Sequence, residues 1–159
     1  MTKSFPNFLH ILASIAFITI IGAAIYEHAA VVPVWTAAPP HSLYMFQGEY
    51  GLQAANFWKP VHPVTILLLA GALFTNWRQA SRKQILIVFG CYLLILVITA
   101  AYFVPELLSI TTSEYSTAAS QDLRSRAQTW ERLSLVRLST LLVLAVVLLH
   151  GLSAKQIKN

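Results

Sequence analysis

The chain has 159 residues, of which 57% are hydrophobic and only 11% are charged. A soluble domain carries roughly a quarter charged residues, so this composition indicates a membrane protein and excludes most soluble enzymes and binding modules. The formal charge of +5 does not indicate nucleic-acid binding, because the basic residues are divided between the two ends of the predicted helices and form no single stripe.

Four apolar stretches are each long enough, at about 20 residues, to cross a hydrocarbon core of about 30 Å. They run from Phe8 to Tyr26, Val61 to Trp77, Ile85 to Val104 and Leu133 to Leu152. With their flanking turns we expect spans at about 8–28, 60–77, 84–105 and 130–152. These spans use up the chain, so residues 1–159 are predicted to form one all-α domain, an integral-membrane four-helix bundle.

The first predicted span begins after Lys3, and Phe5-Pro6-Asn7 is a typical helix start. It ends at Tyr26-Glu27-His28, where two ionisable side chains leave the membrane. The connection from Ala29 to Lys59 is rich in proline and aromatic residues and too hydrophobic for disorder. We expect this long outer loop to form a lid at headgroup level over the end of the bundle.

The second span opens with Trp58-Lys59-Pro60-Val61-His62-Pro63, which holds His62 on the same side of the membrane as His28. The third span ends at Pro105-Glu106. In the polar connection that follows, Ser120 with Asp122 is a helix-start signal, so the fourth helix is predicted to begin near Ser120, outside the membrane.

Orientation follows from the lysines and arginines near the span ends. The amino terminus, the connection between spans two and three, and the carboxyl terminus hold basic residues and no acid: Lys3, Arg78, Arg82, Lys83, Lys155 and Lys158. By the positive-inside rule, both termini are predicted to be cytoplasmic, and the inner membrane of a bacterium is the expected location. All six acidic residues lie on the opposite, outer side.

Arg137 is the central residue of the predicted site. An arginine inside a hydrocarbon-spanning helix costs about 2.5 to 3.5 kcal/mol on insertion scales, so it should face protein or water. Antiparallel spans bring the polar span ends to one face, where we expect Arg137 to meet Glu27, His28, His62, Glu106 and Glu131. Trp130, Ser134 and Arg137 share a face of the last helix through their spacing of four and three.

Three uses of this cluster remain open from the residues alone. His28 and His62, with Glu27 and Glu106, could hold one divalent transition metal such as iron, copper or zinc. Without a metal, a histidine or carboxylate such as Glu131 could remove a proton from a phenolic or enolisable substrate while Arg137 stabilises the anion. Alternatively, Arg137 pairs with Glu27 or Glu106 only to hold the helices together.

Four spans, Phe103-Val104-Pro105 after the third span, a polar connection, and Trp130 followed by Arg137 resemble the anthrone-oxygenase-like family of small membrane proteins. That family includes oxygenases that convert anthrones to anthraquinones without a conventional flavin or haem. The resemblance implies a polyaromatic or quinone-like substrate and makes Trp130 and Arg137 the matching site positions.

From these patterns we expect a small membrane oxidoreductase or oxygenase-like protein that acts on a hydrophobic phenolic or quinone-like molecule at a polar pocket near the outer face. Catalytic roles fall to Arg137, Glu131 and Trp130. The alternative is a non-catalytic subunit of a larger membrane complex or homo-oligomer, or a protein that binds a lipid or quinone. In either case we expect the protein to have membrane lipid, a hydrophobic small molecule and copies of itself or other membrane chains as partners. We expect no nucleic-acid partner.

Overall fold

The structure, a computed structural model, describes residues 4–153, and all regular elements in that range are helical. In chain order these are α1 (Ser4–Tyr26), η1 (Glu27–Val31), α2 (Val32–Trp35), η2 (His41–Phe46), α3 (Ala55–Thr75), α4 (Arg82–Ile98), η3 (Thr99–Phe103), α5 (Val104–Thr111) and α6 (Gln121–Ser153). Successive elements join end to end, so the described residues contain four continuous helices that are long and apolar enough to cross a membrane: Phe5–Trp35, Ala55–Thr75, Arg82–Thr111 and Gln121–Ser153. The predicted all-helical fold with four such segments is confirmed.

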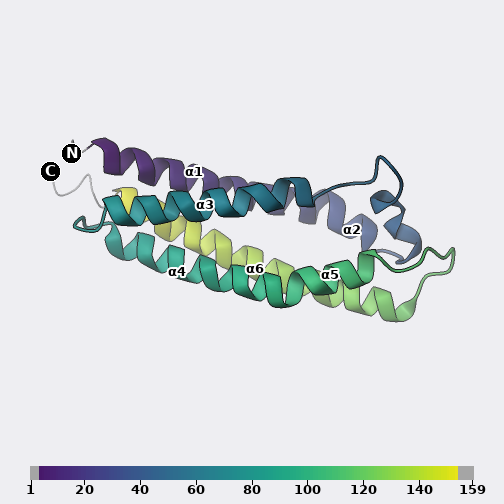
Figure 1. The fold of residues 1–159 in the computed structure, drawn as a ribbon. Helices are drawn as coiled ribbons and strands as arrows, with labels where there is room; N and C mark the ends of the chain where they lie inside the picture. Colours follow the sequence, from purple (N-terminus) through teal and green to yellow (C-terminus); the bar gives the residue numbers. More distant parts are fainter. Residues whose placement is uncertain (1–3, 154–159) are drawn as a thin grey trace.

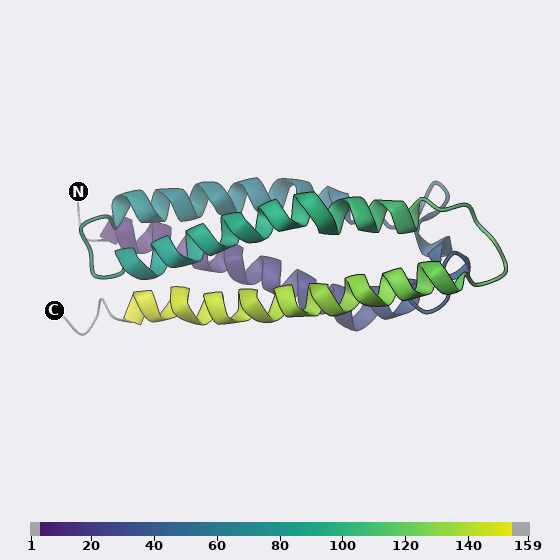
Figure 2. The same ribbon diagram turned by 90° about the horizontal axis from the view of Figure 1, so that it is seen from below.

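The four long helices run antiparallel and form a ring (Figures 1 and 2). α1 packs against α3 and α6, and α4 packs against α3 and α6. The start of α1, the end of α6 and the turn between α3 and α4 lie at one end, which we call the terminal end. α2, η2, α5 and the two longer connections lie at the opposite end, which we call the loop end (Figure 1).

Two helices run further than the sequence predicted, and each continues past a proline. Span one was expected to stop near His28, and span three at Pro105, but they run on to Trp35 and Thr111. In both cases a five-residue π-helical segment precedes a Val-Pro pair. Proline has no N–H for the carbonyl four residues back, and a π-turn, which bonds five residues back, accommodates this loss. The backbone N–H of Val32 accordingly bonds the carbonyl of Glu27, and that of Val104 bonds the carbonyl of Thr99.

The expected lid is therefore shorter than the sequence indicated. Only residues 36–54 lie between the first two long helices, and they include the short helix η2. Leu43 of η2 is buried in a cluster at the loop end with Trp35, Phe103 and Trp130. The aromatic connection thus packs against the loop end of the bundle through Leu43, and its role as a lid at headgroup level stays a prediction.

The fourth long helix begins as predicted. α6 starts at Gln121, and the hydroxyl of Ser120 accepts a hydrogen bond from the backbone N–H of Leu123 at 3.4 Å. The helix has 33 residues, or about 50 Å at 1.5 Å per residue, which exceeds a hydrocarbon core of about 30 Å. One or both of its ends therefore project beyond the hydrocarbon.

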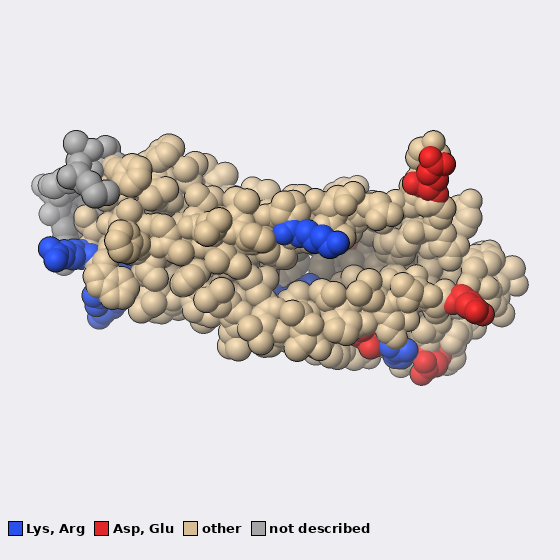
Figure 3. Space-filling model, in the orientation of Figure 1, with Lys and Arg blue, Asp and Glu red and all other residues tan. Residues whose placement is uncertain are grey.

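Charge divides along the bundle. On the face in Figure 3 the acidic side chains all lie toward the loop end, and the surface between α3 and the α4 to α5 helix is hollowed at mid-length. The turn at the terminal end and the first residues of α4 carry only basic side chains, Arg78, Arg82 and Lys83. The loop-end half of α6 carries basic side chains as well, Arg124, Arg126 and Arg132, so the separation is one of acidic residues, whereas the positive-inside rule counts lysine and arginine alone.

Candidate functional site

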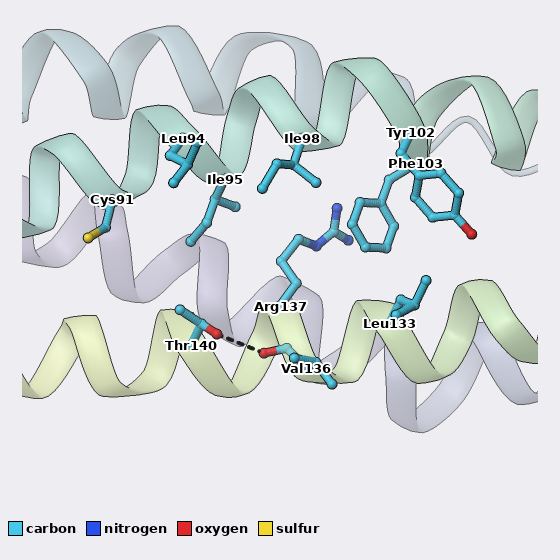
Figure 4. Close-up of a pocket in the computed structure, with 10 residues that line it drawn as sticks. All are labelled: Cys91, Leu94, Ile95, Ile98, Tyr102, Phe103, Leu133, Val136, Arg137 and Thr140. Atoms are coloured by element: carbon cyan, nitrogen blue, oxygen red, sulfur yellow. Dashed lines mark hydrogen bonds between the residues drawn. The ribbon is translucent and has the colours of Figure 1, made fainter.

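Arg137 lies at the middle of α6 and extends toward η3, across the gap between α4 and α6 (Figure 4). Its Nη1 donates a hydrogen bond to the Thr99 hydroxyl at 3.1 Å, and its Nη2 donates to the Ser134 hydroxyl at 2.8 Å. The guanidinium carbon stands 4.1 Å from the centre of the Phe103 ring. Arg137 is thus held by two hydroxyls and one aromatic face.

The π-helical segment η3 supplies two of these contacts. Thr99 and Phe103 are its first and last residues, and both reach Arg137. The Thr99 hydroxyl donates its own proton to the carbonyl of Ile95 at 2.8 Å, so its oxygen is free to accept from Arg137. This local geometry comes from the proline at position 105, because Pro105 favours a π-turn directly before it.

Trp130 closes the site on the side of the loop end. It is buried, its Nε1 donates to the carbonyl of Phe103 at 2.9 Å, and its ring meets the edge of the Phe103 ring at a centroid distance of 5.9 Å. Trp35 packs on its other side at 5.5 Å. Trp130 therefore fixes Phe103 beneath the guanidinium, which fits its predicted place on the arginine face.

Arg137 has no carboxylate at salt-bridge distance. Within residues 4–153 the one salt bridge joins Arg126 Nε to Glu106 Oε1 at 2.8 Å. Glu27 acts on Arg137 only as a more distant electrostatic partner. A guanidinium has five N–H groups, and Arg137 uses two of them on described residues, which leaves three donors for another acceptor.

A cavity of about 400 Å³ lies beside the guanidinium, between α4 and α6. Ten residues line it: Cys91, Leu94, Ile95, Ile98, Tyr102, Phe103, Leu133, Val136, Arg137 and Thr140. Figure 4 shows that they come from both helices and face the gap between them. Arg137 is the only charged residue among these ten, and the surface that they present to the cavity is almost entirely apolar.

A second polar group links η1, α3 and α4. Trp58 Nε1 donates to Glu27 Oε1 at 2.8 Å, and the Trp58 ring stacks on the His62 ring at 5.4 Å. His62 Nδ1 and the Tyr92 hydroxyl are hydrogen-bonded at 2.8 Å. The charge of Arg137 acts on His62, as Glu27 acts on Arg137. A shared site of Glu27, His62 and Arg137 stays a prediction, because no hydrogen bond or salt bridge joins Arg137 to either residue within residues 4–153.

The other predicted site residues have partners elsewhere. Glu106 makes a two-pronged contact with Arg126, through Nε at 2.8 Å and Nη2 at 2.9 Å. Glu131 accepts a hydrogen bond from the Thr36 hydroxyl at 3.3 Å. The Nδ1 of His28 is 2.8 Å from the carbonyl of Ala24, and its buried Nε2 has no partner.

The proposed metal ligands do not assemble in this geometry. Within the described part of the chain there is no group of three or more histidine, cysteine, aspartate or glutamate residues that could hold a metal ion. The engagement of Glu106 by Arg126 accounts for part of this, because it turns one of the four predicted ligands away from the histidines. A metal bound through Glu27, His28 and His62 stays a prediction.

Sequence reasoning missed Thr99, Phe103 and Tyr92 as contacts of the site. A signal for Thr99 was present, because Glu27 and Thr99 each stand six residues before a proline that follows valine. That shared pattern marks both π-helical segments. Tyr92 is one of several aromatic residues in an almost uniformly apolar span, and no local pattern distinguishes it.

Comparison with known proteins gives no matching family model, curated protein or solved structure for this chain. The function is therefore argued from the geometry around Arg137.

Proposed function

We propose that this chain is a small integral-membrane oxidoreductase of the oxygenase kind, which acts on a hydrophobic phenolic or quinone-like molecule bound at Arg137. One observation carries the proposal: a guanidinium in a membrane-crossing helix has unused N–H donors and borders an apolar cavity. A cation inside hydrocarbon costs free energy, so charged residues within membrane-crossing helices are rare. Where they occur, they usually belong to functional sites. A phenolate, enolate or quinone oxygen is an acceptor that a hydrophobic molecule can bring.

The chemistry follows from this placement. An enolisable substrate such as anthrone loses a proton from its ring methylene, and the negative charge moves to the oxygen. Arg137 would stabilise that oxyanion more strongly than the neutral ketone, which lowers the barrier to proton removal. Dioxygen is the oxidant, and anthrone plus O₂ gives anthraquinone plus water. His62 and Glu27, which lie near Arg137, are the candidates for the base.

If a metal ion assists this reaction, Glu27, His28 and His62 are the residues that we propose as its ligands. An iron or copper ion held there would supply oxygen activation, and zinc would only polarise the bound oxygen. Elemental analysis of gently solubilised protein, repeated on a His62→Ala variant, distinguishes a metal-assisted reaction from a metal-free one.

We place the terminal end on the cytoplasmic side of a bacterial inner membrane, since it carries the basic turn. A second candidate is a non-catalytic subunit of a larger complex or homo-oligomer. Spans two and three favour it, because only 17% of the most apolar window of each is buried within the bundle. This candidate predicts that the native protein migrates with partner chains and has no turnover.

The direct test of the proposed function is anthrone oxidation by protein in lipid nanodiscs, followed by the absorbance of anthraquinone. Replacing Arg137 by Met keeps an unbranched, flexible side chain but shortens it and removes the charge. We expect turnover to fall by about 10²-fold or more, the loss seen when an oxyanion donor is removed. Arg132→Met is the matched control, because Arg132 is an exposed arginine on the same helix. Full turnover by folded Arg137→Met protein would refute the proposal.

A further inference from the structure

We infer that the turn between α3 and α4 binds the phosphate of an anionic phospholipid, of which phosphatidylglycerol is the simplest example, in a hollow beside Arg78. The turn lies at the terminal end of the bundle, whereas Arg137 lies at the middle of α6. This lipid site therefore does not depend on the function proposed for Arg137.

An open hollow of about 550 Å³ lies where α3 runs into the turn. It is lined by Phe74, Thr75, Trp77 and Arg78. Because α3 is long and apolar enough to cross a membrane and ends at Thr75, the hollow lies where the chain leaves the hydrocarbon. Small-molecule pockets have volumes of about 300 to 1,000 Å³, so the hollow has room for a lipid headgroup.

The basic side chains of the turn have no acidic partner. Arg78 and Lys83 are exposed, Arg82 is partly exposed, and none of them makes a salt bridge or side-chain hydrogen bond within residues 4–153. The guanidinium carbon of Arg82 stands 5.2 Å from the centre of the Trp77 ring, so its N–H groups still lack an oxygen acceptor among the described residues. Residues 50–105 contain no aspartate or glutamate, and the coloured side chains at the terminal end in Figure 3 are all basic. An anion from outside the chain would balance this charge.

The turn that carries these cations is held in place from within the bundle. Asn76 is fully buried, and its Nδ2 donates to the carbonyl of Pro6 on α1 at 3.0 Å and to that of Ala72 on α3 at 2.8 Å. The backbone N–H of Gln79 bonds the carbonyl of Asn76 at 2.9 Å, and that of Arg82 bonds the carbonyl of Gln79 at 3.2 Å. The backbone of the site is therefore ordered before a ligand arrives, which lowers the entropy cost of binding.

The chemistry of the hollow selects an anionic phospholipid. Guanidinium groups donate paired hydrogen bonds to phosphate oxygens, and basic pockets at the membrane surface recognise anionic headgroups. Phe74 is 83% exposed and Trp77 is 51% exposed, so apolar surface adjoins the cations. The glycerol and acyl chains of a lipid cover such surface, whereas a free phosphate ion does not. A zwitterionic lipid would bring its ammonium group close to three cations, which disfavours it.

The site is tested by native mass spectrometry of the full chain, released from a non-ionic detergent that contains phosphatidylglycerol and phosphatidylcholine with identical acyl chains. Arg78→Gln and Arg82→Gln each remove one charge from the turn. Arg124→Gln is the charge-matched control, because Arg124 is an exposed arginine near the start of α6, at the loop end. A further titration adds millimolar inorganic phosphate, which distinguishes a lipid headgroup from a soluble anion.

We expect the wild type to bind phosphatidylglycerol about tenfold more tightly than phosphatidylcholine. Either turn variant should lose about tenfold in affinity for phosphatidylglycerol, the effect of one hydrogen bond to a charged group. The control should bind as the wild type does, and inorganic phosphate should not displace the lipid.

A wild type without preference between the two lipids would overturn the lipid site, and this comparison stands whether or not the variants fold. An equal loss in Arg124→Gln, with all variants folded by circular dichroism, would show general charge attraction and no site at the turn. Displacement by inorganic phosphate would mean that the turn binds a soluble anion instead.

Discussion

Two arginines on the same helix show what is unusual about Arg137. Arg126 meets Glu106 with two hydrogen bonds and reaches Ser109 with a third at 2.9 Å, so its charge is matched by a carboxylate. Arg137 lies deeper, meets only two neutral hydroxyls, and adjoins a cavity. Arg126, which is easier to solvate, has an ion pair with a carboxylate. Arg137, which is harder to solvate, has N–H donors to spare. This difference is why we assign structural work to Arg126 and ligand binding to Arg137.

The Glu106 to Arg126 pair belongs to the class of weak surface ion pairs. Its side chains are 23% and 34% exposed, so water and salt screen their attraction. We expect Glu106→Gln to lower the free energy of unfolding by less than about 1 kcal/mol. Thermal unfolding in detergent, compared with Glu114→Gln as a loop control, measures this difference. A loss several times larger would mean that the pair is buried by a partner or by lipid.

At the scale of elements, the two π-helical segments decide which side chains face inward. An inserted residue in a turn rotates everything beyond it by about 100° relative to a regular helix. η1 and η3 each make such an insertion before a Val-Pro pair, and through it Thr99 and Phe103 reach Arg137. Sequence periodicity assumes regular helices, so it predicted the spans and the face of Trp130, Ser134 and Arg137. It could not predict which neighbours that face would meet.

The π-helical insertion in η3 also explains why Glu106 pairs with Arg126 and not with Arg137. The sequence predicted that it lies at the same end of the bundle as Glu27 and His62. Its partner depends on the rotation of α5 after η3, and this rotation turns it toward Arg126 instead. Convergence at one end was predictable from topology, whereas pairing required the helix geometry.

Helix packing at the terminal end depends on Gly151. A side-chain β-carbon at this position would stand 3.2 Å from Gln84 Cβ and 3.2 Å from the ring of His10, on two neighbouring helices. We expect Gly151→Val to destabilise the bundle by about 1 to 3 kcal/mol, the usual cost of overpacking. Gly90→Val is the control, because nothing lies within 4 Å of a β-carbon there. Equal unfolding temperatures for the two variants would contradict this close approach.

At the scale of the whole molecule, the bundle separates two environments. Basic side chains mark the turn at the terminal end, and the acidic ones lie toward the loop end, where aromatic packing seals the bundle (Figure 3). Between these ends the long helices expose apolar side chains to lipid, and Arg137 lines the cavity between α4 and α6. The proposed function places its chemistry inside the membrane plane, so the proposed ligand has to be soluble there.

We propose that Arg137 recognises an oxygen on a membrane-dissolved ligand. The decisive experiment compares the affinities of 2-naphthol and naphthalene for protein in nanodiscs, since the two probes differ by one hydroxyl. We predict that the wild type binds 2-naphthol about tenfold more tightly or better, which corresponds to about 1.4 kcal/mol. Arg137→Met should remove this preference, and Arg132→Met should keep it. A preference for 2-naphthol that survives in folded Arg137→Met protein would contradict the account.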